Sequence, residues 1–127
     1  LAYLDQLNSH FKDAGFKVLA VNANEPTILR LVKPYVNKRK YKFDVAVDPR
    51  FKLGDQFGVK GMPTQFLIAP DGSVISETSG FTDGDEEKYL KELIDYFDSE
   101  NIKYDKNFQF VKQARNAASD NNTDINF

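Results

Sequence analysis

The sequence contains no cysteine, no tryptophan and a single histidine. Without cysteine, these 127 residues can form no disulfide bond, no thiolate zinc site and no cysteine nucleophile. The one histidine, His10, leaves little for a histidine-rich metal site or a Ser-His-Asp triad. We therefore expect no metal, no cofactor and no catalytic residue within this chain.

Positive and negative side chains almost balance, with 17 Lys and Arg against 19 Asp and Glu and a formal net charge of −2. A net charge so close to zero gives no global field that would attract nucleic acid or an anionic membrane. The basic run at 38–42 is accordingly interpreted as a solvated loop. No apolar run approaches the ~20 residues that a transmembrane helix needs. We expect neither a nucleic-acid partner nor a membrane span.

The order of apolar and polar residues predicts alternating helices and strands. Near-continuous apolar residues at 16–22 and an alternating pattern at 43–47 predict two strands. Between them we expect a helix capped by Asn24 and kinked or split at Pro34. Further elements should be a first helix that ends near Ala14, a short helix at 51–57, strands at 65–69 and 73–79 joined by a hairpin turn, and a last helix starting at Thr82. This order is typical of an α/β layer fold.

The two ends of the chain differ from its middle. Helical spacing of apolar residues is present from Leu1 onward, so we expect further residues in front of it, although no signal peptide is visible. His10 lies beside the apolar stripe and is interpreted as a solvated helix residue. The asparagine-rich end should hold a short helix with Phe108, Val111 and Ala114, followed by a loose tail.

The segment 58–72 carries the most specific motif. From Gly58 to Ile68 it reads Gly-Val-Lys-Gly-Met-Pro-Thr-Gln-Phe-Leu-Ile, and Asp-Gly follows at 71–72. This string resembles the cis-proline segment of the thioredoxin superfamily, in particular the TlpA-like extracytoplasmic thiol-disulfide oxidoreductases of the redoxin type. The resemblance implies a thioredoxin-like three-layer α/β/α fold with a mixed sheet. It covers residues 1–97, incomplete at the N-terminus, and leaves 98–127 as a C-terminal extension.

The same resemblance implies a substrate-binding loop. In that family the bond before the proline of this motif is cis, and the residue before it offers its backbone to an extended substrate peptide. The loop residues in this sequence are Gly61, Met62, Pro63 and Thr64.

The family's chemistry depends on a Cys-x-x-Cys motif at the start of the first long helix, after a central strand. The present sequence resembles the family only from inside that helix onward. We therefore expect the motif and the strand to lie upstream of Leu1. We also expect this chain alone to be redox-inert. The absent strand would lie between the strands at 16–22 and 65–69. We therefore expect no hydrogen-bonded ladder between 18–21 and 65–68. Upstream residues or a strand from another chain should fill that position.

Functions from two classes follow from this resemblance. The first is a thiol-disulfide oxidoreductase acting on protein thiols or disulfides, in the periplasm or otherwise outside the cytoplasm. The alternative is a cysteine-free thioredoxin-like module that binds peptides or has a structural role. A peroxiredoxin-like protein is a minor alternative, because no arginine precedes the strand at 65–69.

Overall fold

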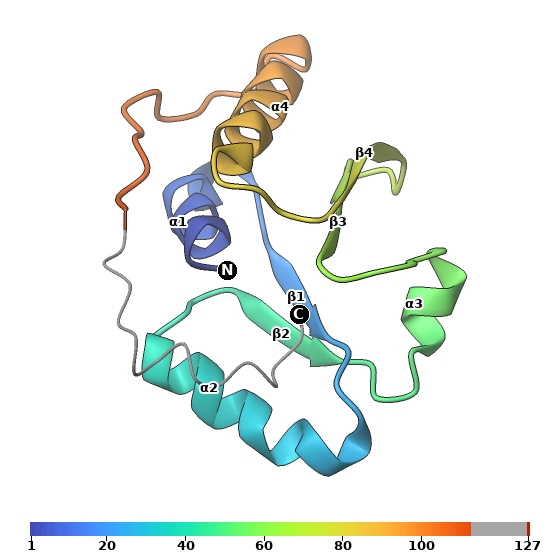
Figure 1. Cartoon of the computed structure of the whole chain (residues 1–127). Helices are drawn as coiled ribbons and strands as arrows, with labels where there is room; N and C mark the ends of the chain where they lie inside the picture. Colours follow the sequence, from blue (N-terminus) through green and yellow to red (C-terminus); the bar gives the residue numbers. More distant parts are fainter. Residues whose placement is uncertain (113–126) are drawn as a thin grey trace.

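In the computed structural model, residues 1–112 and 127 are described, and their helices and strands follow the expected α/β order (Figure 1). In chain order the elements are α1 (Ala2–His10), the 3-10 helix η1 (Lys12–Ala14), β1 (Leu19–Asn22), the 3-10 helix η2 (Pro26–Leu31), α2 (Val32–Arg39), β2 (Asp44–Val47), α3 (Lys52–Gln56), β3 (Thr64–Ile68), β4 (Val74–Ser79) and α4 (Asp85–Ser99).

The four strands form two separate pairs. β1 and β2 are parallel, with Leu19 opposite Asp44, and β3 and β4 are antiparallel, with Thr64 opposite Ser79. Within the described residues no ladder joins β1 to β3. The predicted open position between these two strands is therefore confirmed. One edge of β1 and one edge of β3 remain without a neighbouring strand.

The main apolar cluster joins the first and last helices. Leu7 and Phe11 pack against Leu93 and Phe97 of α4, and all four side chains are buried. Helical spacing places each pair on one face of its helix, which explains why both helices turn an apolar stripe toward one another. In Figure 1 the pair β1–β2 lies between α1 and α4 on one side and α2 on the other.

Residues 102–111, which we call the C-terminal strap, cross the outer side of this cluster. Tyr104 and Phe108 pack on the Phe11 ring, with centroid distances of 6.2 and 5.3 Å. The strap contains neither helix nor strand. The helix expected to carry Phe108 and Val111 is therefore absent from this segment, and Ala114 lies outside the described residues. Aromatic packing, rather than helix formation, places these side chains on the cluster.

The predicted split of this helix is confirmed, but it falls before Pro34, between Leu31 and Val32. η2 is a 3-10 helix as far as Leu31, and α2 begins at Val32. Pro34 thus falls in the first turn of α2, where its missing N–H leaves no helical hydrogen bond unmade. Lys38 and Arg39 form the last turn of α2, whereas 40–42 follow it outside any helix or strand, so only the second part of the basic run is the loop that the sequence suggested.

Two predicted helix caps are wrong. Asn24 is 4% exposed, and its side-chain oxygen accepts a hydrogen bond from the Asn22 amide instead of capping η2. α4 begins at Asp85 rather than at Thr82. The Asp85 carboxylate accepts a hydrogen bond from the Thr82 N–H at 2.9 Å. The side chain at the helix start thus reaches back to Thr82, whereas the prediction had the Thr82 side chain accept from the helix.

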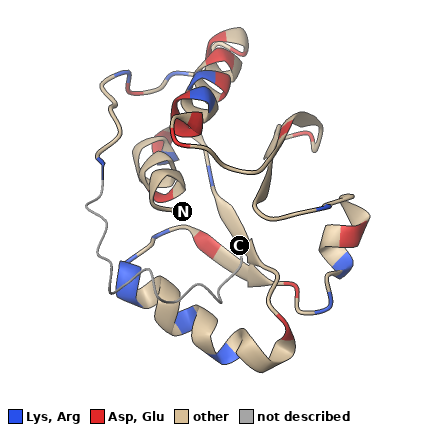
Figure 2. Ribbon diagram, viewed as in Figure 1, with Lys and Arg blue, Asp and Glu red and all other residues tan. Residues whose placement is uncertain are grey.

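The near-zero net charge hides a separation of charge along the chain. Residues 26–43 contain six Lys or Arg and no acidic residue. Residues 82–100 contain eight Asp or Glu and two Lys. In Figure 2 the charged side chains of α2 are all basic, whereas those of α4 are mainly acidic.

Candidate functional site

The Gly61–Thr64 loop connects the end of α3 to the start of β3. Gly58, with a φ of +69°, lets the chain leave α3 in the left-handed region that favours glycine. The Met62–Pro63 peptide bond is cis. Two hydrogen bonds hold the loop: the Thr64 hydroxyl donates to the Gly61 carbonyl at 2.6 Å, and the Gly80 N–H donates to the Pro63 carbonyl at 2.7 Å.

Met62 is the residue of this loop that is open to a ligand. Its side chain is 40% exposed. Among residues 1–112, no hydrogen bond uses its backbone N–H or C=O. An extended peptide could therefore pair with this backbone as an added strand does.

Two exposed apolar residues belong to the loop and to the segment before it. Met62 lies in the loop, and Phe57, just after α3, is 42% exposed; we call these two residues the apolar flank. The ring of Phe57 lies 5.1 Å from the ring of Phe66 on β3, the strand that follows the loop.

The loop also adjoins the open position between the two sheets. β3 begins at Thr64, directly after the loop, and is paired with β4 on one edge alone. A strand placed between β1 and β3 would therefore run next to the loop. The sequence-based site residues Gly61, Met62, Pro63 and Thr64 form this loop, which leads into β3.

Sequence analysis missed a buried polar pair at the end of β1. Asn22 is fully buried, and its amide donates to the Asn24 side-chain oxygen at 2.7 Å. Its own oxygen accepts the Asn24 N–H at 3.0 Å. Buried polar groups that satisfy one another in this way fix the local backbone. The sequence signal for this pair is Asn22 itself, a polar residue at the end of an apolar strand.

The interpretation of His10 as a solvated residue is wrong. Its side chain is only 21% exposed, and Nε2 lies 2.9 Å from the Asp105 carbonyl oxygen. Its ring packs 4.7 Å from the ring of Phe108. His10 therefore belongs to the contact between α1 and the strap.

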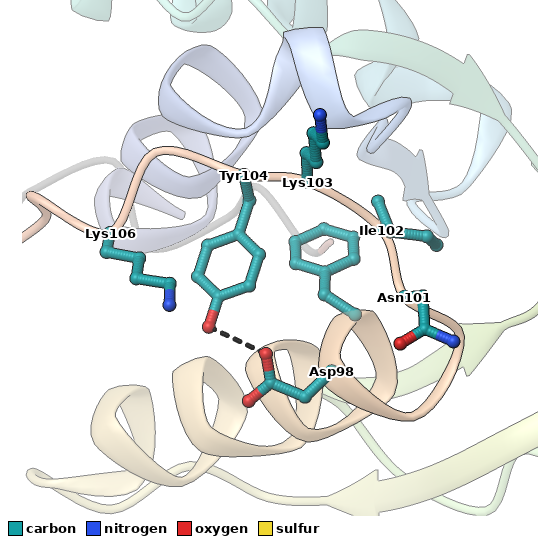
Figure 3. Close-up of a pocket in the computed structure, with 7 residues that line it drawn as sticks. Asp98, Asn101, Ile102, Lys103, Tyr104 and Lys106 are labelled. Atoms are coloured by element: carbon teal, nitrogen blue, oxygen red, sulfur yellow. Dashed lines mark hydrogen bonds between the residues drawn. The ribbon is translucent and has the colours of Figure 1, made fainter.

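An open hollow of about 380 Å³ lies where α4 meets the strap, away from the loop (Figure 3). Inside it the Tyr104 hydroxyl donates to the Asp98 carboxylate at 3.0 Å. Desolvation raises the pKa of the Tyr104 hydroxyl, and this hydrogen bond raises it further. The tyrosine hydroxyl is the donor of this hydrogen bond, which fastens the strap to α4.

The described residues contain no group of three or more His, Asp or Glu side chains able to hold a metal ion. None of the helices in 1–112 is both long and apolar enough to cross a membrane. The acidic residues Asp85, Glu86 and Glu87 occupy the first turn of α4, where the helix dipole favours negative charge.

Comparison with known proteins places these features in a family. The model of the AhpC/TSA family matches residues 1–76. The thiol-disulfide oxidoreductase ResA of Bacillus anthracis is 35% identical over 94 residues, which are 73% of this chain and 53% of that protein. ResA of Bacillus subtilis (strain 168) is 32% identical over 78 residues, or 61% of this chain and 42% of that protein. The chain spans about half the length of the curated relatives it matches.

A solved structure from Chlorobium tepidum, described as a thiol:disulfide interchange protein DsbE, superposes with a TM-score of 0.68. It is 32% identical, and the match covers 73% of this chain and 64% of the other. The agreement of sequence and structure confirms the thioredoxin-like α/β fold. The chain therefore belongs to the AhpC/TSA family.

Proposed function

We propose that these residues form most of the redox domain of a thiol-disulfide oxidoreductase whose reactive Cys-x-x-Cys pair lies outside them. The observation that carries this proposal is the position of the Gly61–Thr64 loop beside the open place between β1 and β3. ResA and DsbE, which the chain resembles, are named as thiol-disulfide enzymes. A strand that fills the open place would bring its carboxyl end toward this loop.

The reaction would be a thiol-disulfide exchange. A thiolate attacks one sulfur of a substrate disulfide, forms a mixed disulfide and releases the other substrate sulfur as a thiolate. The second cysteine of the pair then attacks the mixed disulfide, which frees the reduced substrate and leaves the enzyme oxidised. Every sulfur in this sequence of steps comes from the upstream pair or from the substrate.

The part of these residues would be to hold the substrate chain. The free N–H and C=O of Met62 would pair with an extended substrate backbone, and Met62 and Phe57 would contact its apolar side chains. Backbone pairing is largely indifferent to sequence, so the loop would accept many protein substrates. The substrate class is thus a protein thiol or disulfide in an extended segment.

The test is to express the reading frame extended upstream and to count its thiols before and after reduction. Two thiols that oxidise together, and reduction of a protein disulfide, are the expected result. The 127-residue chain, which has no cysteine, is the matched control and should be inactive. Met62→Asp in the extended protein should raise KM for a protein disulfide, because it places a charge on the apolar flank. An upstream segment without a cysteine pair would overturn the proposal.

A cysteine-free module that binds peptides through the same loop is the alternative, and the absence of cysteine in these residues favours it. An upstream segment without cysteine, combined with peptide binding that Met62→Asp weakens, would support it. Peroxide consumption by the extended protein would instead point to a peroxiredoxin-like activity. For the oxidoreductase we propose an extracytoplasmic location, which fractionation of the source cells would test.

A further inference from the structure

A strongly basic surface lies on η2, α2 and the residues that follow α2, apart from the candidate loop. It is formed by five exposed cations that we call the basic ridge, Arg30, Lys33, Lys38, Lys40 and Lys42. None of the five side chains forms an ion pair with another described residue. Arg39 is not part of the ridge, because its guanidinium lies over the ring of Tyr35, 3.7 Å from its centre.

Acidic groups near the ridge are few and already engaged or peripheral. Asp44 lies 3.9 Å from the Lys17 ammonium, and the Asp5 carboxylate accepts the backbone N–H of Lys42 at 2.6 Å. Glu25 precedes η2 at its far end. Asp5, beside Lys42, and the C-terminal Phe127, whose ring lies 5.9 Å from that of Tyr35 on α2, bring two negative groups close to the ridge. Five cations without an ion pair among the described residues outnumber them, so the ridge keeps a net positive charge.

The cations of the ridge are spread along the chain instead of gathered around one hollow. In Figure 1 α2 forms a border of the molecule, and the two hollows at the strap, one against α4 and one against α1, are lined by no residue of η2 or α2. Exposed Pro34 and Asn37 separate Lys33 from Lys38 along α2. Cations spread in this way fit a broad anionic plane better than a single phosphate.

We propose that the basic ridge docks this domain on an anionic phospholipid surface. Four of its five cations are lysine, a residue depleted at protein–protein interfaces but effective against anionic lipid headgroups. Leu31, 39% exposed between Arg30 and Lys33, can enter the headgroup region beside them. Nucleic acid is disfavoured, because a polyanion that wraps the domain would also meet the acidic α4, whereas a membrane plane contacts one face only.

The separation of charge would also orient the domain. A negative plane attracts α2 and repels α4, which carries most of the acidic residues (Figure 2). In Figure 1 the connection between α3 and β3 lies away from α2, so the Gly61–Thr64 loop would remain accessible. This inference does not depend on the thiol chemistry proposed above.

The test is sedimentation of the 127-residue chain with vesicles, at low salt. Vesicles of phosphatidylcholine containing phosphatidylserine should bind the chain, and vesicles of phosphatidylcholine alone should not. The combined variant Lys33→Gln and Lys38→Gln should bind roughly 25-fold more weakly, at about fivefold per cation. Binding should also disappear in 1 M salt, where the Debye length is about 3 Å. A run without vesicles corrects for any sedimentation of the chain alone.

The matched control is Lys88→Gln with Lys91→Gln, which changes the net charge equally but on the acidic helix α4. It should bind like the unmodified chain, and circular dichroism should show all three proteins equally folded. Equal losses in both variants would show a nonspecific charge effect and overturn the proposal. Binding to soluble polyglutamate but not to the vesicles would indicate an acidic protein partner and would overturn it as well.

Discussion

The side chain of Gln6 makes two hydrogen bonds with the backbone of Val111. Its amide nitrogen donates to the Val111 carbonyl at 2.8 Å, and its oxygen accepts the Val111 N–H at 2.7 Å. The Gln6 carboxamide thus satisfies the backbone N–H and C=O of Val111, as a neighbouring strand would. With the His10 contact to Asp105, it fastens the strap to α1 at two points.

Replacing Gln6 by alanine should loosen the strap. Net contributions of ~0.5–1.5 kcal/mol per hydrogen bond, reduced by exposure, predict a loss of about 1 kcal/mol in the free energy of unfolding. Amide hydrogen exchange at 104–111 should accelerate more than exchange in β1. Gln109→Ala, an exposed change on the strap itself, is the control and should alter neither quantity. Identical behaviour of the two variants would show that the Gln6 contact contributes nothing.

Phe11 should be the most sensitive position in the core. Its side chain is 1% exposed and contacts Phe97, Tyr104 and Phe108. Phe11→Ala should cost about 3–5 kcal/mol, a large part of a typical stability of about 5–15 kcal/mol. Phe81→Ala, which removes a ring that is 45% exposed, should cost much less. Thermal unfolding of both variants measures the difference, and equal shifts in Tm would contradict the assignment of the core.

The isolated chain should self-associate through its open strand edges. Leu19 and Ile68 belong to the two open strands and are 61% and 48% exposed. Unpaired edges with apolar side chains are templates for pairing with another chain. Leu19→Lys with Ile68→Lys should shift sedimentation velocity toward the monomer. Val111→Lys, at a side chain that is 69% exposed but on the strap, should leave association unchanged. A monomeric unmodified chain would refute this expectation.

The hairpin turn contains a carboxylate with a shifted pKa. The Ser73 hydroxyl and backbone N–H donate to Asp71 Oδ1 at 2.6 and 2.9 Å, and they lower the pKa of Asp71. The pKa of Asp71 is lower in the folded than in the unfolded chain, so its hydrogen bonds stabilise the fold slightly at pH values above the ordinary pKa of an aspartate. This small stabilisation is lost as the pH falls through the pKa of the folded state. Ser73→Ala should raise the pKa of Asp71 part of the way back. A carboxyl NMR titration measures it, with Ser99→Ala as control.

Local patterns predicted most of the secondary structure, because each signal acts within a few residues. Pro34 indicated that the helix is split, although the division falls just before it, and alternating residues located β2. Asn24 failed as a cap because burial against Asn22 offered its side chain a better partner than the helix end. That partner is a matter of tertiary packing, which no local pattern contains.

Part of the candidate site could be predicted and part could not. Met62 and Pro63 were identified through a motif, and the structure places them at an exposed loop. The role of His10 was missed because its partners Asp105 and Phe108 are about a hundred residues away in the sequence. Phe108 was expected on a short helix, and Tyr104 and Phe110 were not singled out, because the packing of these rings on distant residues decides where the strap lies.

The Gln6–Val111 contact spans 105 residues of sequence. A chain made from its N-terminus exposes α1 long before the strap exists to cover it. Phe11 and its neighbours therefore remain solvated, or contact other surfaces, until the last part of the domain has left the ribosome. Contacts of such long sequence separation slow folding, since the loop must close before the contact can form. Completion of the core is thus a late event in the life of the nascent chain, and α1 is covered only after the strap has been made.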